Sequence, residues 1–403
     1  MKTRVVITSM GFITSMGNSE LEVMNRFQTD TVGFRFDDDY QRVPVCPVQD
    51  FDLRQYTGRL KNRRYLNRGA GFCVAAAILA TRDGKTSNRE LSHAGLFTGT
   101  GPNFDISSEC GEIVHGDLDH SSLQALWMLR FLPNTASSII SEILGIHGEN
   151  ATINTACSAS LQAIGEAYRR IKDGYLEIAL AGGGDSRLSK GGILAYQKAK
   201  ALFIGEGDPC TLYSTFDEKR DGFVPGEGGA FFVLEELSCA EKRNAPIIGE
   251  VCGFGCSLDG WNMTAPEPKG IWGEKAVRHA LKEADVRPMD IDLVTAHGTG
   301  TLLNDQMEAA LIHRIFSEKQ PFVISLKSWI GHLAAACGAV ETAITLLCMN
   351  NSFLPKIRNL KRPCAPDINL VLENREAQAN LALIQSFGFG GQNSALVVRK
   401  WKK

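Results

Sequence analysis

Three short motifs recur in the same order in the two halves of the chain, and this internal repeat restricts the possible folds most strongly. Each motif joins an apolar run to a turn of glycine or other small residues. The pairs are residues 96–101 with 294–300, 153–158 with 323–328, and 178–184 with 383–391. Each half also opens with a Val/Ile-rich run, at residues 4–7 and 247–251. The repeat predicts two similar halves, residues 1–246 and 247–403; the alternative is chance similarity between glycine-rich turns.

The apolar runs are nearly continuous rather than alternating, as at residues 230–234, 381–384 and 395–398. Strands of a sheet that is covered by helices on both faces show such runs. The sequence therefore predicts an α/β protein in which two similar halves pack together, with loops at the strand ends meeting between them.

The composition is that of an ordinary globular chain, with 403 residues, 44% hydrophobic residues and a net charge of −2. This near-neutral charge gives no support to binding of nucleic acid or of a membrane surface. No apolar run approaches the roughly 18 residues of a membrane helix. Eleven cysteines without a CxxC pair favour reduced thiols over disulfides or a zinc site. We therefore expect a cytoplasmic protein.

Cys157 lies where a short strand-like run gives way to small residues and then to apolar residues at helical spacing. The apolar positions are Leu161, Ile164, Tyr168 and Ile171. A cysteine at a helix start lies close to unpaired backbone N–H groups and to the positive end of the helix dipole, which favour the thiolate. The sequence therefore predicts a nucleophile with a depressed pKa; the alternative is a small buried apolar residue.

Two histidines, His297 and His332, each follow a strand-like run and adjoin glycine, which lets the backbone approach a ligand closely. Lys327 ends the apolar run at residues 322–326, and Glu341 lies in an apolar helical segment. A buried Lys–Glu ion pair would explain both charges, because neither is tolerated alone in the interior. The histidines lack short-range ligand spacing and a carboxylate cluster, so no metal site is predicted.

Six motifs carry a resemblance that runs from one end of the chain to the other. They lie at residues 155–160, 216–228, 264–266, 296–301, 327–332 and 387–393. Together they resemble the discrete β-ketoacyl-acyl-carrier-protein synthases, which are type II ketosynthases of the thiolase superfamily. The resemblance implies a thiolase-like five-layered αβαβα fold, with the nucleophile in residues 1–246 and the two histidines in residues 247–403. It also implies a dimer, and substrates carried on the phosphopantetheine arm of acyl-carrier protein rather than a cofactor bound by the chain.

Carried over position by position, the resemblance makes Cys157 the residue that takes the acyl chain from a carrier-protein thioester. His297 and His332 correspond to the pair that assists malonyl decarboxylation and stabilises the enolate. Lys327 and Glu341 correspond to the ion pair that supports these histidines.

The resemblance also assigns the backbone N–H groups of Cys157 and Phe389 to an oxyanion hole. Phe389 would further act as the gate between acyl and malonyl binding. Thr299, Thr301 and Phe387 are expected to bind the substrate or its carrier arm.

Three residues depart from the family pattern. Asn262 stands where many relatives carry histidine, Trp329 is unusually bulky, and Asn67 replaces a common aspartate. With the Thr-Ala-Cys-Ser-Ala-Ser sequence at residues 155–160, they favour a polyketide or polyene pathway. Housekeeping fatty-acid elongation is the alternative.

Two other classes within the superfamily fit less well. A non-catalytic chain-length factor usually lacks the cysteine, so Cys157 argues against it. A degradative thiolase needs a second, C-terminal cysteine, where this chain has Phe-Gly-Phe-Gly-Gly at residues 387–391. The expected activity is therefore that of an acyltransferase that extends an acyl chain by two carbons through decarboxylative Claisen condensation. Its expected state is a homodimer, or a heterodimer with a chain-length-factor-like homologue.

Five cations lie within ten residues of this nearly neutral chain: Arg59, Lys61, Arg63, Arg64 and Arg68. We predict that this basic cluster docks an acidic acyl-carrier protein. The alternative is a solvated helix face.

Overall fold

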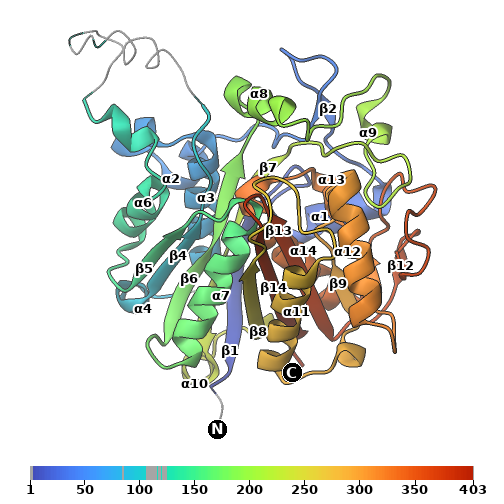
Figure 1. The fold of residues 1–403 in the computed structure, drawn as a ribbon. Helices are drawn as coiled ribbons and strands as arrows, with labels where there is room; N and C mark the ends of the chain where they lie inside the picture. The colour runs from blue at the N-terminus through green and yellow to red at the C-terminus, as the bar shows by residue number, and fades with distance from the viewer. Residues whose placement is uncertain (1–2, 84–85, 106–115, 117–118, 120–124, 403) are drawn as a thin grey trace.

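A single ten-stranded sheet forms the centre of the protein in the computed structural model, which describes residues 3–83, 86–105, 116, 119 and 125–402 (Figure 1). The strand order is β10-β9-β13-β14-β8-β1-β7-β6-β4-β5. The N-terminal half contributes β1 (Val5–Ile13), β4 (Gly95–Gly99), β5 (Asn150–Ile153), β6 (Ile178–Ser186) and β7 (Glu227–Glu236). The C-terminal half contributes β8 (Gly249–Leu258), β9 (Leu293–Thr295), β10 (Phe322–Ile324), β13 (Leu381–Gly388) and β14 (Gln392–Lys400). Two small antiparallel pairs lie apart from this sheet: β2 (Arg35–Phe36) with β3 (Pro44–Val45), and β11 (Phe353–Leu354) with β12 (Arg375–Glu376).

The two halves of the sheet have the same topology when read outward from the antiparallel β1–β8 pair at its centre. The order β1-β7-β6-β4-β5 on one side matches β8-β14-β13-β9-β10 on the other. The repeated sequence motifs fall at equivalent places, at β4 and β9, β5 and β10, and β6 and β13. The prediction of two similar halves is therefore confirmed. Residues 246 and 247 lie in the loop between α10 and β8, where the chain passes from one half to the other.

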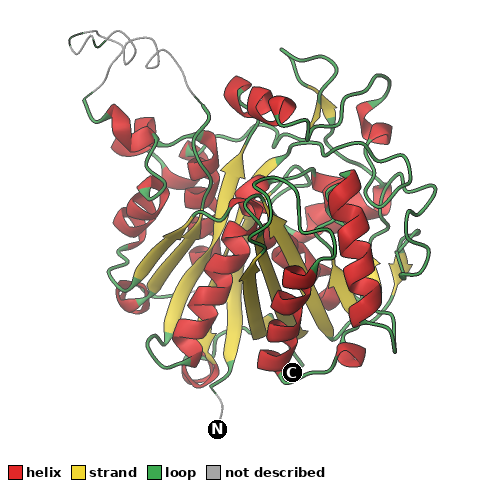
Figure 2. Cartoon of the chain, in the orientation of Figure 1, coloured by secondary structure: helices red, strands yellow, loops and turns green. Residues whose placement is uncertain are grey.

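Helices pack against the sheet (Figure 2), and two of them lie between the strands of its two halves. The main helices are α3 (Arg68–Asp83), α7 (Ala159–Lys172), α11 (Ile271–Ala284), α12 (Leu302–Ile315) and α14 (Cys337–Asn351). α3 packs on β1, β6 and β7, whereas α11 packs on β8 and β14. α7 contacts strands of both halves, and α14 lies against α7, β7 and β13. The five strands of each half form one β layer, and α7 and α14 form the helical layer between them. This is the predicted αβαβα arrangement.

Shorter elements complete the chain. They are α1 (Glu20–Thr29), α2 (Arg54–Thr57), α4 (Asn88–His93), α6 (Thr135–Leu144), α8 (Lys190–Lys198), α9 (Pro209–Leu212), α10 (Leu237–Lys242) and α13 (Lys327–Ile330), with 3-10 helices η1 (Lys61–Tyr65), η2 (Trp127–Arg130), η3 (Ala156–Ser158), η4 (Pro288–Asp290) and η5 (Ala334–Ala336). None of the helices that the structure describes is both long enough and apolar enough to cross a membrane.

The sequence of α14 explains its central place. The helix is buried continuously from Cys337 to Met349 and is apolar around its whole circumference, as a helix enclosed by protein must be. A Cβ on Gly338 would lie only 2.4 Å from the Cβ of Leu161 in α7, so this position has no room for a side chain. The close contact brings the first turns of α7 and α14 together.

Candidate active site

Cys157 lies in η3, at the turn from β5 into α7. Ala156 just before it takes a left-handed conformation with φ of 49°, which bends the chain sharply. Ser386 Oγ donates to the Cys157 carbonyl (2.8 Å), and Ser158 Oγ donates to the Ser386 carbonyl (2.9 Å). A Cβ on Gly388 would lie 3.0 Å from the Cys157 nitrogen. The cysteine turn is therefore held closely by β13 of the other half.

His297 follows β9 and is held by the buried side chains of Lys327 and Glu308. Lys327 Nζ donates to the His297 carbonyl (2.5 Å) and lies 3.2 Å from its Nδ1. Glu308 accepts hydrogen bonds from the backbone N–H groups of His297 (2.6 Å) and Gly298 (2.7 Å). Because the lysine donates to Nδ1, the hydrogen of the neutral ring lies on Nε2.

His332 follows α13 and Gly331, whose φ of 72° suits glycine. Its backbone N–H donates to the Val224 carbonyl (2.7 Å). The Ala334 N–H donates to Nδ1 of the ring (2.9 Å), so this ring also carries its hydrogen on Nε2. Phe223 packs against the imidazole with ring centroids 4.7 Å apart.

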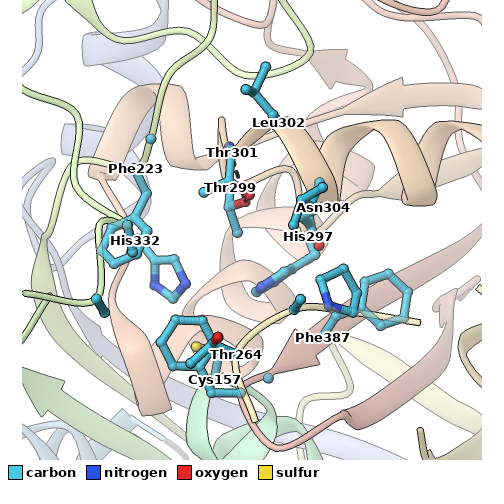
Figure 3. Close-up of a pocket in the computed structure, with 18 of the residues that line it drawn as sticks. Cys157, Phe223, Thr264, His297, Thr299, Thr301, Leu302, Asn304, His332 and Phe387 are labelled. Carbon is cyan, nitrogen blue, oxygen red and sulfur yellow. Dashed lines mark hydrogen bonds between the residues drawn. The ribbon is translucent and has the colours of Figure 1, made fainter. Parts of the chain in front are cut away.

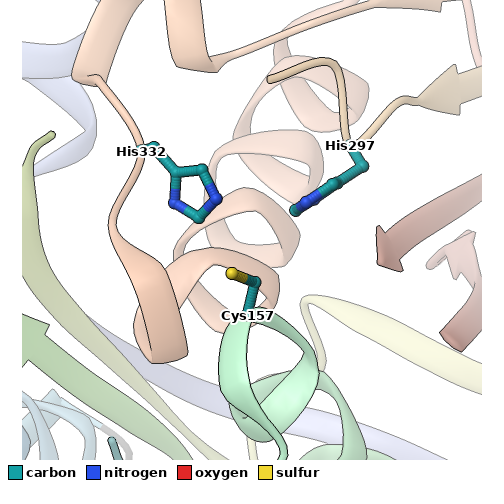
Figure 4. A group of neighbouring side chains, drawn as sticks. All are labelled: Cys157, His297 and His332. Carbon is teal, nitrogen blue, oxygen red and sulfur yellow. The ribbon is translucent and has the colours of Figure 1, made fainter. Parts of the chain in front are cut away.

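These elements bring one sulfur atom and two imidazoles together (Figure 4). Cys157 Sγ and one ring nitrogen each of His297 and His332 all lie within 4.8 Å of one another. The two rings are nearly perpendicular, at 85°, with centroids 5.5 Å apart. Thiolate and imidazole can also ligate zinc, but the Lys327 ammonium beside His297 repels a cation. That the site binds no metal stays a prediction.

The buried Lys–Glu pair predicted from the sequence is present behind the histidines. Lys327 Nζ lies 2.5 Å from Glu341 Oε1, and neither side chain is more than 1% exposed. Glu341 lies on α14, so the pair joins the central helix to the turn that carries His332. Removing one partner of such a pair leaves a buried charge and typically costs about 3–5 kcal/mol of stability.

Both imidazoles are neutral at physiological pH. Burial lowers the pKa of His297 well below its usual value of 6.5, and the Lys327 charge lowers it further. Burial and Lys327 lower the pKa of His332 in the same way. With Nδ1 occupied on both rings, the site offers two neutral Nε2–H donors.

For the Cys157 thiol, the prediction of a depressed pKa is wrong. Burial raises its pKa to about 11 and outweighs the lowering by the Lys327 charge and by a backbone hydrogen bond from Phe389. Desolvation disfavours the charged thiolate, and it is the largest influence on this thiol. The thiol is therefore protonated at neutral pH.

A cavity of about 310 Å³ is lined by Cys157 and both histidines (Figure 3). Thr299, Thr301, Phe387 and Phe389, the residues assigned by resemblance to substrate binding and gating, line the same cavity. The hydroxyl oxygens of Thr299 and Thr301 lie 2.9 Å apart. The structure thus brings together every predicted residue of the site's interior, which came from both halves of the chain.

The sequence reasoning missed the carboxylates that hold the His297 loop. Asp305 accepts a hydrogen bond from the Phe216 backbone (2.7 Å), and Asn304 Nδ2 donates to both Asp305 (3.1 Å) and Glu308 (3.3 Å). Burial raises the pKa of Glu308 to about 8. Both acids lie in a mixed segment of α12, where Asn304 and Gln306 are polar as well, so no local pattern marked them as buried.

A second buried ion pair, Asp185 with Arg187, was also missed. Arg187 Nη2 lies 2.8 Å from Asp185 Oδ2, which also accepts from the Ala335 backbone N–H (3.0 Å). Ala335 adjoins the residue that donates to the His332 ring. The pair therefore ties β6 to the turn that orients this histidine, a long-range contact without a local sequence signal.

The basic cluster lies on η1, on the loop before it and at the start of α3, and none of its five side chains lines the cavity. Arg68 donates two hydrogen bonds to the buried Glu227 (2.6 and 2.7 Å), and Arg63 lies 3.4 Å from Asp52. Arg68 is thus paired within the fold although its side chain is 42% exposed, and the docking role of the cluster stays a prediction. The exposed cations are Arg59, Lys61, Arg64 and Arg68, and Arg63 is half-buried.

The three departures from the family pattern have local structural roles. Asn262 Oδ1 accepts from two backbone N–H groups just after it, and Asn67 Oδ1 accepts from the Ala70 backbone (2.8 Å) at the start of α3. Trp329 is fully buried and donates from Nε1 to the Lys356 carbonyl (2.7 Å). These contacts stabilise turns and the core, so the three residues carry no argument about the pathway.

Comparison with known families agrees with this geometry. The N-terminal domain of β-ketoacyl synthases matches residues 2–240, and the C-terminal domain of the same enzymes matches residues 248–361. The chain belongs to the β-ketoacyl synthase family. It is therefore an acyltransferase of the condensing type.

Individual relatives are similar over their whole length. The 3-oxoacyl-[acyl-carrier-protein] synthase 2 of Synechocystis sp. is 32% identical over 100% of this chain and 99% of its own. The enzyme of that name from Vibrio harveyi is 32% identical over 99% of both chains. Among solved structures, a β-ketoacyl synthase from Burkholderia phymatum has a TM-score of 0.92 at 30% identity, covering 99% of this chain and 100% of its own. The ishigamide ketosynthase/chain length factor has a TM-score of 0.89 at 28% identity, covering 100% of both chains.

The raised pKa of Cys157 predicts a pH-dependent reactivity. Because the thiolate is a minor species below a pKa of about 11, alkylation of Cys157 by iodoacetamide should accelerate about tenfold per unit between about pH 7 and about pH 9. Mass spectrometry of the Cys157 peptide measures the rate, with free cysteine, whose pKa is about 8.5, as the control. A rate that levels off below about pH 8 would show that the thiolate is stabilised instead.

Proposed function

We propose that this synthase joins an acyl chain held on Cys157 to a malonyl group carried by acyl-carrier protein, with loss of carbon dioxide. The observation that carries the proposal is the meeting of a thiol and two neutral imidazoles within 4.8 Å at one cavity, in a chain of this family. One nucleophile and two oxyanion donors are the groups that such a condensation requires.

The first step transfers the acyl chain. Cys157 Sγ attacks the carbonyl carbon of the thioester, the bond to the carrier's sulfur breaks, and the carrier leaves as a thiol. Because the Cys157 thiol is protonated, its proton must leave as the sulfur attacks, and it ends on the departing sulfur. Backbone N–H groups of Cys157 and Phe389 stabilise the oxyanion.

The second step makes the carbon–carbon bond. The bond between the malonyl carboxylate and its neighbouring carbon breaks, carbon dioxide leaves, and the electron pair remains as an enolate. The Nε2–H groups of His297 and His332 donate to the enolate oxygen as its charge develops. The enolate carbon then attacks the acyl carbonyl, the bond to Cys157 breaks, and the departing thiolate takes up a proton from solvent.

Phe389 separates the two steps as a gate. It lines the cavity, and the next two residues, Gly390 and Gly391, have φ of 80° and 75°, which other residues rarely adopt. Because glycine has no Cβ, such a pair lets the loop change its conformation without backbone strain. Acyl binding and malonyl binding would then require different positions of the Phe389 ring.

The pathway that we propose is a specialised polyketide or polyene pathway, with fatty-acid elongation as the alternative. The sequence around Cys157 favours it, as does the similarity to the ishigamide ketosynthase at 28% identity. The 3-oxoacyl synthase 2 relatives favour the alternative. The ratio of kcat/KM for polyunsaturated and saturated acyl-carrier-protein substrates decides between them.

We also propose that the chain works as a dimer, either with itself or with a chain-length-factor-like homologue. β5 lies at the edge of the sheet, so one row of its backbone groups is open to pairing with another chain. The partial burial of residues 151–153 along this strand also suits an interface.

The central prediction is that Cys157 alone carries the acyl chain. Incubation with acyl-carrier-protein substrates and peptide mass spectrometry should find the adduct on the Cys157 peptide only. Cys157→Ala should lose both adduct and condensation, while Cys210→Ala, which removes a thiol away from the cavity, should keep both. An adduct elsewhere, or condensation by Cys157→Ala, would overturn the proposed function.

A second prediction divides the labour between the two steps. Replacing His297 or His332 with Ala should reduce malonyl decarboxylation by about 10²-fold or more, as loss of an oxyanion donor does, with less effect on acylation of Cys157. Asn at either position keeps an N–H donor and should retain more activity. Equal loss of both steps would assign the histidines to proton transfer from the thiol instead.

The basic cluster gives a third prediction, because exposed charge acts mainly on association and is screened within about 8 Å at physiological salt. Arg63→Glu with Arg64→Glu should raise the apparent KM for acyl-carrier protein about tenfold at low salt and leave kcat nearly unchanged. A pantetheine thioester should be used as before. Lys242→Glu with Lys282→Glu makes the same change of net charge elsewhere on the surface and should have little effect. Loss of activity on the small thioester would make the cluster structural.

A further inference from the structure

Exposed apolar side chains gather near the cavity that contains Cys157. Six of the fifteen large apolar side chains that are exposed in the described chain belong to residues 261–272 and 302–303, and they are between 38% and 77% exposed. We call them the apolar rim: Trp261, Met263, Ile271, Trp272, Leu302 and Leu303. Single exposed apolar residues are normal on soluble proteins, whereas a group of this size marks a binding surface.

Both segments of the rim belong to the wall of the cavity. Leu302 and Leu303 line it directly, as does Thr264 from the first segment. The Gly390 N–H donates to the Met263 carbonyl (2.7 Å), which ties that segment to the loop of the proposed gate. The rim therefore continues the surface of the proposed active site.

The rim also lies at the outer end of the cavity. The lining residues Thr264, Lys200 and Leu302 are exposed, whereas Cys157 and both histidines are buried. Figure 3 shows Leu302 on the opposite side of the cavity from Cys157. A substrate that reaches the thiol through this cavity therefore passes the two rim leucines, Leu302 and Leu303.

The charge of the cavity wall favours one kind of substrate carrier. Its lining holds one lysine, Lys200, and two carboxylates, Asp221 and Asp259, and both histidines are neutral. A free nucleotide coenzyme carries several phosphates, which proteins bind with groups of arginine and lysine. A thioester arm with one phosphate needs one cation, and a protein that bears the arm can cover apolar side chains.

We infer that the apolar rim is the seat of the carrier protein, which docks by an apolar face beside the base of its thioester arm. The inference rests on the proposed function and deepens it, because it assigns the contact surface to the rim rather than to the basic cluster. Apolar contact is non-directional and is not screened by salt. The cluster then acts on the approach of the carrier, and the rim on its residence.

The test uses two rim residues that do not line the cavity. The double variant Trp261→Ser with Ile271→Ser should raise KM for an acyl-carrier-protein thioester about tenfold or more, at low and at high salt alike. Its kinetics with a pantetheine thioester should match the unaltered protein. The control, Leu21→Ser with Tyr175→Ser, removes one aliphatic and one aromatic exposed side chain elsewhere and should change neither.

Other outcomes overturn the inference in distinguishable ways. An unchanged KM for the carrier-borne substrate removes the rim as its seat, and equal loss on the pantetheine thioester shows that the rim shapes the cavity instead. A changed oligomeric state in light scattering, with KM unchanged, assigns the rim to contact between copies of the chain. If the unaltered protein condenses no carrier-borne substrate at all, the proposed function itself fails.

Discussion

The buried ammonium group of Lys327 is the interaction on which the active site depends. It has no access to water, so Glu341 and the backbone and ring of His297 supply its partners. In return its charge lowers the pKa of both histidines and directs the hydrogen of the His297 ring to Nε2. This buried cation thus adds to the effect of burial in keeping both imidazoles neutral, and it sets the tautomer of the His297 ring.

Burial shifts the pKa of the thiol and the pKa of the imidazoles in opposite directions, and both kinds of group stay uncharged. It keeps the imidazoles neutral, which suits a donor to an enolate oxygen, but it also keeps Cys157 protonated. The nucleophile is therefore activated only when a thioester is present, because the departing sulfur of that thioester can take up the proton. Such a site protects the cysteine from unrelated electrophiles at the cost of a concerted proton transfer.

The protein separates polar and apolar tasks along one cavity. Its inner end holds the buried ion pairs and hydrogen-bonded loops, where position must be kept accurately. Its outer end presents apolar side chains, which accept a partner surface without exact geometry. The arrangement suits the proposed carrier-borne substrate, because loose docking of a carrier on apolar side chains would still leave the reacting atoms tightly placed.

The sequence by itself determined the two-halved α/β fold and the chemistry of the site's interior. Continuous apolar runs specify buried strands, the repeat specifies equivalent halves, and a lysine and a glutamate in apolar segments specify each other because neither is tolerated alone. Only the tertiary structure decided the direction of the Cys157 pKa shift, the binding of Arg68 by Glu227, and the exposure of Trp261, Ile271 and Leu302. The reason is physical: burial and contacts across hundreds of residues set these properties, and no local pattern records them.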